Sequence, residues 1–116
     1  MTATVSTVWR TVCGYDDLLP ERGVCALVDG VAVAIFRTFD GSLHAVANLD
    51  PFSGASVLSR GIVGTRQGVP TVASPVFKQV FDLASGQCLD DPAVTIDVHA
   101  VRRRGDDVEV SLRCPR

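Results

Sequence analysis

The chain has 116 residues, 47% of them hydrophobic and 21% charged, which is enough for one globular domain and too few for two of ordinary size. Its 11 Lys and Arg against 13 Asp and Glu give a net charge of −2, so its charge does not favour nucleic acid or a membrane as a partner. The longest apolar run, 31–36, is far below the roughly 18 residues of a membrane span, and the N-terminus lacks the pattern of a signal peptide. We therefore expect a cytoplasmic protein.

The first half of the chain predicts an antiparallel meander. Residues 8–13 alternate apolar and polar side chains, as an edge strand does, and a turn-rich stretch with room for one helical turn follows at 15–23. The β-branched runs 24–28 and 31–37 flank Asp29 and Gly30, a pair that favours a two-residue hairpin turn because both positions tolerate positive φ. The run 31–37 is apolar on both faces, so it should lie inside the domain.

A turn at Asp40 and Gly41 leads to a third strand at 43–47, and a long, poorly periodic loop is predicted from 48 to 70. Loops of this length in compact domains tend to be functional. Beyond it the pattern predicts short strands at 71–74 and 79–82 and a closing hairpin that turns at 105–107. No segment shows a helical period, so we expect an all-β fold.

Two segments beyond the meander each place a proline directly after a small polar residue. They are Asn-Leu-Asp-Pro-Phe at 48–52 and Ser-Pro-Val-Phe-Lys-Gln at 74–79. These two boxes, with Phe-Asp-Leu-Ala-Ser-Gly at 81–86, resemble the loops of Rieske-type [2Fe-2S] domains. In such domains each box supplies one Cys and one His to the cluster. The resemblance implies an antiparallel β-sandwich with a two-loop subdomain.

The ligands of that family are missing from this chain. Asp50 and Phe52 stand where the first box has Cys and His, and Ser74 and Phe77 stand where the second has them. A phenyl ring has no lone pair, and carboxylate or hydroxyl oxygens are poor ligands for iron held by sulfide and thiolate. We therefore expect no metal and no cofactor in this chain, and we expect Phe52 and Phe77 to fill the space by packing.

The four cysteines do not replace the missing ligands. Cys13 and Cys25 precede the first box, Cys88 and Cys114 follow the second, and no two of them form a C-x-x-C motif. In a reducing cytoplasm they are most simply small buried or half-exposed thiols.

One branch of the Rieske superfamily shares this loss of ligands, namely the small subunits of NAD(P)H-dependent nitrite reductase. The chain resembles them over nearly its whole length, most specifically at 50–64 and 74–79. We expect a single domain at 7–116 after a flexible tail at 1–6. The resemblance implies a non-catalytic role beside a large subunit, which carries FAD, a [4Fe-4S] cluster and sirohaem and reduces nitrite to ammonium with six electrons.

In cluster-bearing relatives the two loops form the tip that meets electron-transfer partners, so we expect the large subunit to bind here. Arg60 is predicted either to contact that partner or to form an internal ion pair, and the run 102–104 either to be a solvated hairpin tip or to face a partner. His44 and His99 are assigned no catalytic or metal role. The candidate partner-binding residues are Asp50, Pro51, Phe52, Arg60, Ser74, Pro75, Phe77 and Lys78.

Two other functions stay open from the sequence. The first is an electron carrier of the Rieske ferredoxin class, against which the missing ligands count. The second is an unrelated β-sandwich module that binds a small ligand, which a deep apolar pocket between the sheets would favour.

Overall fold

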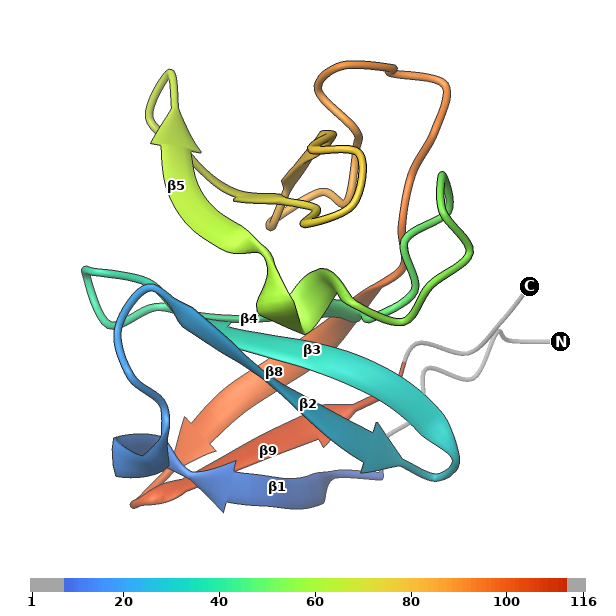
Figure 1. Cartoon of the computed structure of the whole chain (residues 1–116). Helices are drawn as coiled ribbons and strands as arrows, with labels where there is room; N and C mark the ends of the chain where they lie inside the picture. The colour runs from blue at the N-terminus through green and yellow to red at the C-terminus, as the bar shows by residue number, and fades with distance from the viewer. Residues whose placement is uncertain (1–7, 113–116) are drawn as a thin grey trace, which may run out of the picture.

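The computed structural model describes residues 8–112, in which strands dominate and the helical segments are two short 3₁₀ turns (Figure 1). The all-β prediction is confirmed. None of the helical segments in this part of the chain has the length and apolar character that crossing a bilayer requires. The predicted tail at 1–6 and Cys114 lie outside the described residues. The elements are β1 (Arg10–Gly14), η1 (Tyr15–Asp17), β2 (Arg22–Val28), β3 (Val31–Arg37), β4 (Leu43–Ala47), η2 (Leu58–Arg60), β5 (Ile62–Arg66), β6 (Val69–Ala73), β7 (Val80–Asp82), β8 (Val98–Arg104) and β9 (Asp107–Ser111).

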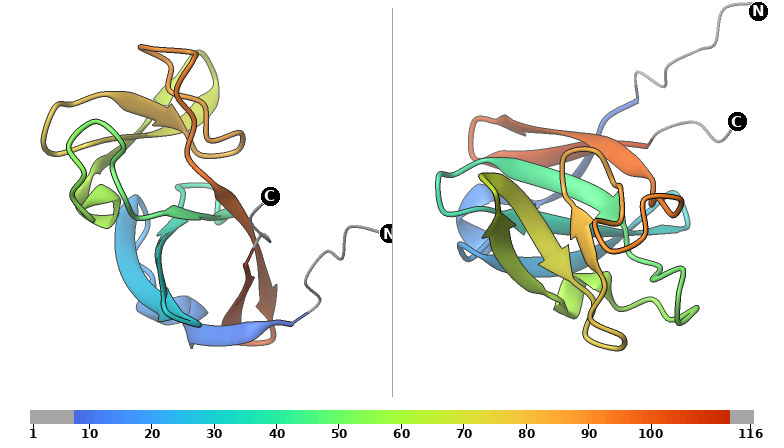
Figure 2. Two further views of the ribbon diagram at one scale, coloured as in Figure 1. Left: turned by 90° about the vertical axis from the view of Figure 1, so that its right-hand side faces the viewer. Right: turned by 90° about the horizontal axis from the view of Figure 1, so that it is seen from above.

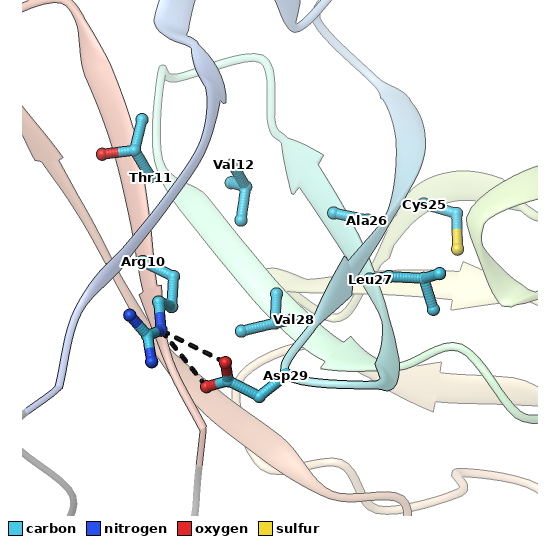
Figure 3. Close-up of a pocket in the computed structure, with 8 residues that line it drawn as sticks. All are labelled: Arg10, Thr11, Val12, Cys25, Ala26, Leu27, Val28 and Asp29. Atoms are coloured by element: carbon cyan, nitrogen blue, oxygen red, sulfur yellow. Dashed lines mark hydrogen bonds and ion pairs between the residues drawn. The ribbon is translucent and has the colours of Figure 1, made fainter.

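The strands form two antiparallel sheets, a larger one in the order β1-β9-β8-β4-β3-β2 and a smaller one in the order β5-β6-β7. The larger sheet curls nearly into a barrel, as the left view of Figure 2 shows. Its edge strands β1 and β2 approach each other without a ladder between them, and a groove of about 650 Å³ lies there (Figure 3). An exposed ion pair between Arg10 Nε and Asp29, at 3.2 Å, joins the two edges at one end of this groove.

Strand β3 connects the two cores of the molecule because both of its faces are buried, as its apolar sequence predicts. Val33 and Ile35 point into the curled sheet, where they pack in one hydrophobic cluster. Ala34 and Phe36 face the smaller sheet and belong to a second cluster, which also contains Phe81. The smaller sheet is thereby packed on the outer face of the larger one.

The predicted loop at 48–70 is wrong in its second half, where the chain forms β5 and begins β6. A two-residue turn at Gln67 and Gly68, with φ of 53° and 81°, joins these strands in the same way as Asp29 and Gly30 join β2 and β3. Proline argues against a strand, but Pro70 lies opposite Thr65 of β5 and beyond the end of β7, where its carbonyl still accepts the amide of Leu83 at 3.0 Å. The closing turn is also shorter than predicted, because Asp107 already pairs with Arg104.

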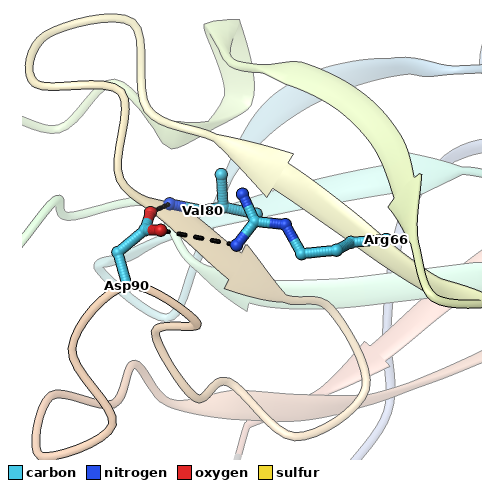
Figure 4. Close-up of polar contacts among 3 residues, drawn as sticks. All are labelled: Arg66, Val80 and Asp90. Carbon is cyan, nitrogen blue, oxygen red and sulfur yellow. Dashed lines mark hydrogen bonds and ion pairs between the residues drawn. The ribbon is translucent and has the colours of Figure 1, made fainter.

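The segment after β7 covers the free edge of that strand (Figure 4). Asp90 accepts a hydrogen bond from the amide of Val80 at 2.9 Å and forms an ion pair with Arg66 at 3.4 Å. The hydrogen bond from Val80 is the main cause that lowers the pKa of Asp90, and Arg66 adds to it. Asp90 therefore joins β5 and β7 across the small sheet.

Gly23 lies where η2 approaches the larger sheet closely. A Cβ atom at Gly23 would lie 2.5 Å from the carbonyl oxygen of Ser59 and 2.5 Å from the ring of Phe36. We expect Gly23→Ala to lower the free energy of unfolding by about 1–3 kcal/mol, measured by urea denaturation, because backbone and ring must move apart. Gly64→Ala is the matched control, since its Cβ would meet nothing closer than 3.7 Å. Equal stabilities of the two variants would contradict this close contact.

Candidate partner-binding site at the two box loops

The two proline boxes fold into loops with the same backbone hydrogen bonds. We call residues 50–55 the first box loop and residues 74–79 the second. In each, the amide of the first residue donates to the carbonyl of the sixth, and the amide of the fifth donates to the carbonyl of the first. The distances are 2.8 and 2.8 Å in the first loop and 2.9 and 3.0 Å in the second. The fifth residue has positive φ in both, 73° at Gly54 and 63° at Lys78.

A buried hydrogen bond joins the two box loops. Ser74 Oγ donates to Asp50 Oδ2 at 2.5 Å, and both side chains are buried. The other oxygen of Asp50 accepts the amide of Phe52 at 2.9 Å, and Ser74 Oγ accepts the amide of Val76 at 3.3 Å. Each of the two side chains thus fixes the backbone of its own loop and also binds the side chain of the other loop. We refer to the Asp50–Ser74 bond as the clasp.

The clasp favours the ionised form of Asp50. Burial alone raises the pKa of this carboxyl, but the hydrogen bonds from Ser74 and Phe52, with further ones from Ser53, outweigh burial. They hold the pKa of Asp50 below its ordinary value of 3.8. A charged acceptor makes the bond from Ser74 stronger than one between neutral groups.

The two phenylalanines differ in their environments. Phe52 is half-buried and packs on the inter-sheet core, with its ring centroid 6.2 Å from that of Phe81. Phe77 is 58% exposed. The expectation of packing is therefore confirmed for Phe52 and wrong for Phe77. Residues 75–78 of the second box loop are all exposed, and the buried groups between the loops are Asp50 and Ser74 of the clasp.

The residues at the four ligand positions do not fit an iron–sulfur cluster. They offer a carboxylate and a hydroxyl already bonded to each other, and two phenyl rings with no donor atom. Within residues 8–112 no group of three or more His, Cys, Asp or Glu side chains could hold a metal ion. Cys88 is buried in the inter-sheet core, and Cys25 is exposed on β2. Burial raises the pKa of Cys13 in β1, and the charge of Asp17 adds to this effect.

Asn48 anchors the first box loop and was not singled out by the sequence. Its side chain is buried, donates to Ser56 Oγ at 2.9 Å and accepts the amide of Ser59 at 2.7 Å, and its carbonyl accepts the amides of Val57 and Leu58. The first box loop therefore lies between two fixed points, Asn48 and η2. The available signal was an Asn as the first residue of the box.

The outer surface of the box loops and of Leu49 beside the first carries large exposed apolar side chains. Leu49, Val76 and Phe77 are 52%, 44% and 58% exposed. Of the predicted partner-binding set, Pro51, Pro75, Phe77, Lys78 and Arg60 are exposed, whereas Asp50 and Ser74 are buried and serve to hold the loops. Sequence reasoning missed Leu49 and Val76, which carry no signal beyond their places within the two boxes.

The basic side chains that the sequence offered as candidates differ in whether they form ion pairs within the domain. Neither Arg60 nor Lys78 forms an ion pair with a described residue, so the internal ion pair considered for Arg60 is absent from this part of the chain. Arg102 instead pairs with Glu109 at 2.7 Å and stacks on Trp9, and Arg103 stacks on Tyr15. Much of the basic run at 102–104 is therefore used within the domain.

Comparisons with known proteins agree on one family. The model of the Rieske-like [2Fe-2S] domain matches residues 8–111. The nitrite reductase (NADH) small subunit of Escherichia coli K12 is 42% identical over 103 residues, which is 88% of this chain and 95% of that protein. The crystal structure of a proposed NADH-dependent nitrite reductase small subunit from Mycobacterium tuberculosis is 52% identical, covers 93% of this chain and 97% of its own, and has a TM-score of 0.89. The nitrite reductase [NAD(P)H] large subunit of Klebsiella oxytoca is 38% identical over 88 residues, which is 76% of this chain and 9% of that protein.

Ser74→Ala tests the clasp directly. The variant leaves the buried carboxylate of Asp50 with one donor fewer, so we expect the free energy of unfolding to fall by about 1–3 kcal/mol in urea denaturation at pH 7. Ser59→Ala is the control, because the Ser59 hydroxyl makes no hydrogen bond to a described residue. If both variants unfold like the parent, the clasp contributes nothing to stability.

The lowered pKa of Asp50 predicts a pH dependence. Asp50 holds its proton less tightly when folded, so its stabilising effect is present above about pH 4 and is lost as the pH falls through its lowered pKa. Asp50→Asn should therefore be less stable than the parent at pH 7, and this difference should narrow as the pH is lowered from 4 toward 2.

Urea denaturation at a series of pH values measures this difference. Hydrogen bonds lower the pKa of Asp40 to about 2, chiefly the one from Thr38 and then those from Ser42. Asp40 is present in both proteins, so its contribution cancels in the difference between their stabilities. The exposed Asp16, substituted to Asn, provides the control. A constant difference between parent and Asp50→Asn over this pH range would rule out the assigned ionisation.

Proposed function

The chain belongs to the nitrite reductase small subunits within the Rieske-like [2Fe-2S] domain family, and from this premise we propose that it binds the large subunit without carrying electrons itself. The large subunit would hold FAD, a [4Fe-4S] cluster and sirohaem and reduce nitrite to ammonium in the cytoplasm. Nitrogen passes from oxidation state +3 to −3, so six electrons and eight protons convert nitrite to ammonium and two waters. We propose that the nicotinamide cofactor supplies all six electrons through the large subunit.

The clasp is the observation that carries this proposal. It joins the two box loops with a hydrogen bond between oxygens, at the positions where the family has thiolate ligands. The loops therefore keep a fixed shape in a chain whose residues there do not suit iron. A fixed loop pair with an exposed apolar surface is suited to binding another protein, since little entropy is lost on docking.

The Klebsiella oxytoca protein supports the choice of partner. Its similarity to this chain lies within 9% of a much longer polypeptide named as a large subunit. A domain that is part of the large-subunit chain in one protein is expected to contact the same large-subunit domains when it is a separate chain. This argument favours the large subunit over other binding partners.

The alternative functions gain less support. An electron carrier of the ferredoxin class needs a cluster, and the donor atoms at the four positions are unsuitable for one. A small-ligand module would need an open pocket between the sheets. Fully buried side chains occupy that space instead, namely those of Phe36, Leu58, Phe81 and Leu83. A stoichiometric [2Fe-2S] absorbance from the purified chain would reverse this preference.

Phe77 provides the test of the docking surface. Because its ring is 58% exposed, we expect Phe77→Ser to change the free energy of unfolding by less than about 0.5 kcal/mol. Binding to the purified large subunit should weaken on the order of tenfold in a titration, because an apolar contact is lost from the interface.

Phe39→Ser is the matched control, since Phe39 is 74% exposed in the β3–β4 turn, outside the box loops. It should bind the large subunit like the parent. Equal binding of the parent and Phe77→Ser would remove the box loops from the interface. Failure of the parent to bind the large subunit at micromolar concentration would contradict the proposed function itself.

A further inference from the structure

A groove of about 430 Å³ lies between the start of β2 and the segment that joins η2 to β5. Gly23 and Gly61 line it where the two segments approach closely, and a Cβ atom at Gly61 would collide with the carbonyl oxygen of Ala73. Ala73 directly precedes Ser74, so this part of the groove lies beside the second box loop. The groove is therefore next to that part of the docking surface proposed above.

The charges that line this groove are not neutralised within the domain. Arg22 and Arg60 both line it, both are exposed, and neither has a hydrogen bond or ion pair from its side chain to any residue in 8–112. Several other arginines are paired, as Arg10 is with Asp29, Arg66 with Asp90 and Arg102 with Glu109. Two unpaired guanidinium groups at one groove favour a ligand that carries carboxylates.

One acidic residue and one apolar residue also belong to the groove. Glu21, exposed and at a positive φ of 63°, leaves the lining side chains with a net charge of +1. Ile62, at the start of β5, is 74% exposed. A ligand that matches the groove therefore carries negative charge and an apolar side chain, which describes an acidic peptide segment better than an inorganic anion.

We infer that this groove receives an acidic segment of the large subunit, whose carboxylates pair with Arg22 and Arg60 and whose apolar side chain covers Ile62. This inference rests on the proposed function, because it takes the large subunit as the partner. It extends the interface from the apolar box loops to a charged region beside them. Complementary charge of this kind raises the association rate and fixes the orientation of a complex.

Charge reversal of the two arginines tests the inference. Arg22→Glu and Arg60→Glu should each weaken binding to the purified large subunit about tenfold, because like charges then face each other. Glu21→Gln should strengthen binding severalfold, since it removes the one opposing charge. The affinity of the parent should fall with added salt more steeply than that of Arg60→Gln.

Arg104→Glu is the matched control for charge reversal. Arg104 is exposed and forms no ion pair with a described residue, but it lies at the end of β8, away from the groove. It should bind like the parent, and thermal unfolding of all the variants should match the parent.

The outcomes separate this inference from the proposed function. If the parent binds the large subunit and the Arg22 and Arg60 variants bind equally well, the groove is not part of the interface, while the proposed function stands. If Arg104→Glu weakens binding as much as they do, the effect is one of net charge and the groove assignment is wrong. If the parent does not bind, the proposed function and this inference fail together.

Discussion

A single hydrogen bond, from Ser74 to Asp50, connects two loops that are 24 residues apart in the sequence. In a cluster-bearing Rieske domain four metal–ligand bonds make this connection. A buried hydrogen bond to a charged group is worth about 1.5–3 kcal/mol, far less than a bound cluster, so it cannot hold disordered loops together by itself. The loops must already be close to their final shape before the clasp forms.

Several local interactions give the loops that shape. Each box loop closes its own backbone with two hydrogen bonds, and the side chain of its first residue accepts an amide two residues later. Asn48 fixes the entry to the first loop, and Phe52 ties it to the inter-sheet core. The polar pair lies inside and apolar side chains such as Phe77 lie outside, which reverses the usual arrangement. The clasp thereby determines which side chains the tip presents.

The sequence predicted the fold where strong local signals agree. Strand β3 and its hairpin followed from a β-branched run and from Asp29–Gly30, whose backbone requires positive φ. Strand β5 was missed because Gly64 interrupts its apolar pattern and Gln67–Gly68 is a weaker turn signal. The loss of the cluster ligands was visible in the sequence, but the clasp was not, since its geometry depends on how both sheets pack. Phe77 was misjudged because an aromatic residue in a loop gives no sign of which way the loop bends.

Net charge conceals the electrostatic character of this domain. A total of −2 argues against a polyanionic partner, yet charge acts locally within about a Debye length, roughly 8 Å at physiological ionic strength. Ion pairs neutralise Arg10, Arg66 and Arg102 on other parts of the surface. Arg22 and Arg60 remain unpaired beside the box loops, so the acidic chain has a locally cationic groove there. An acidic protein surface suits both the apolar tip and the cationic groove. A neutral protein surface gains nothing from the groove, and a nucleic acid would meet the excess of carboxylates elsewhere on the chain.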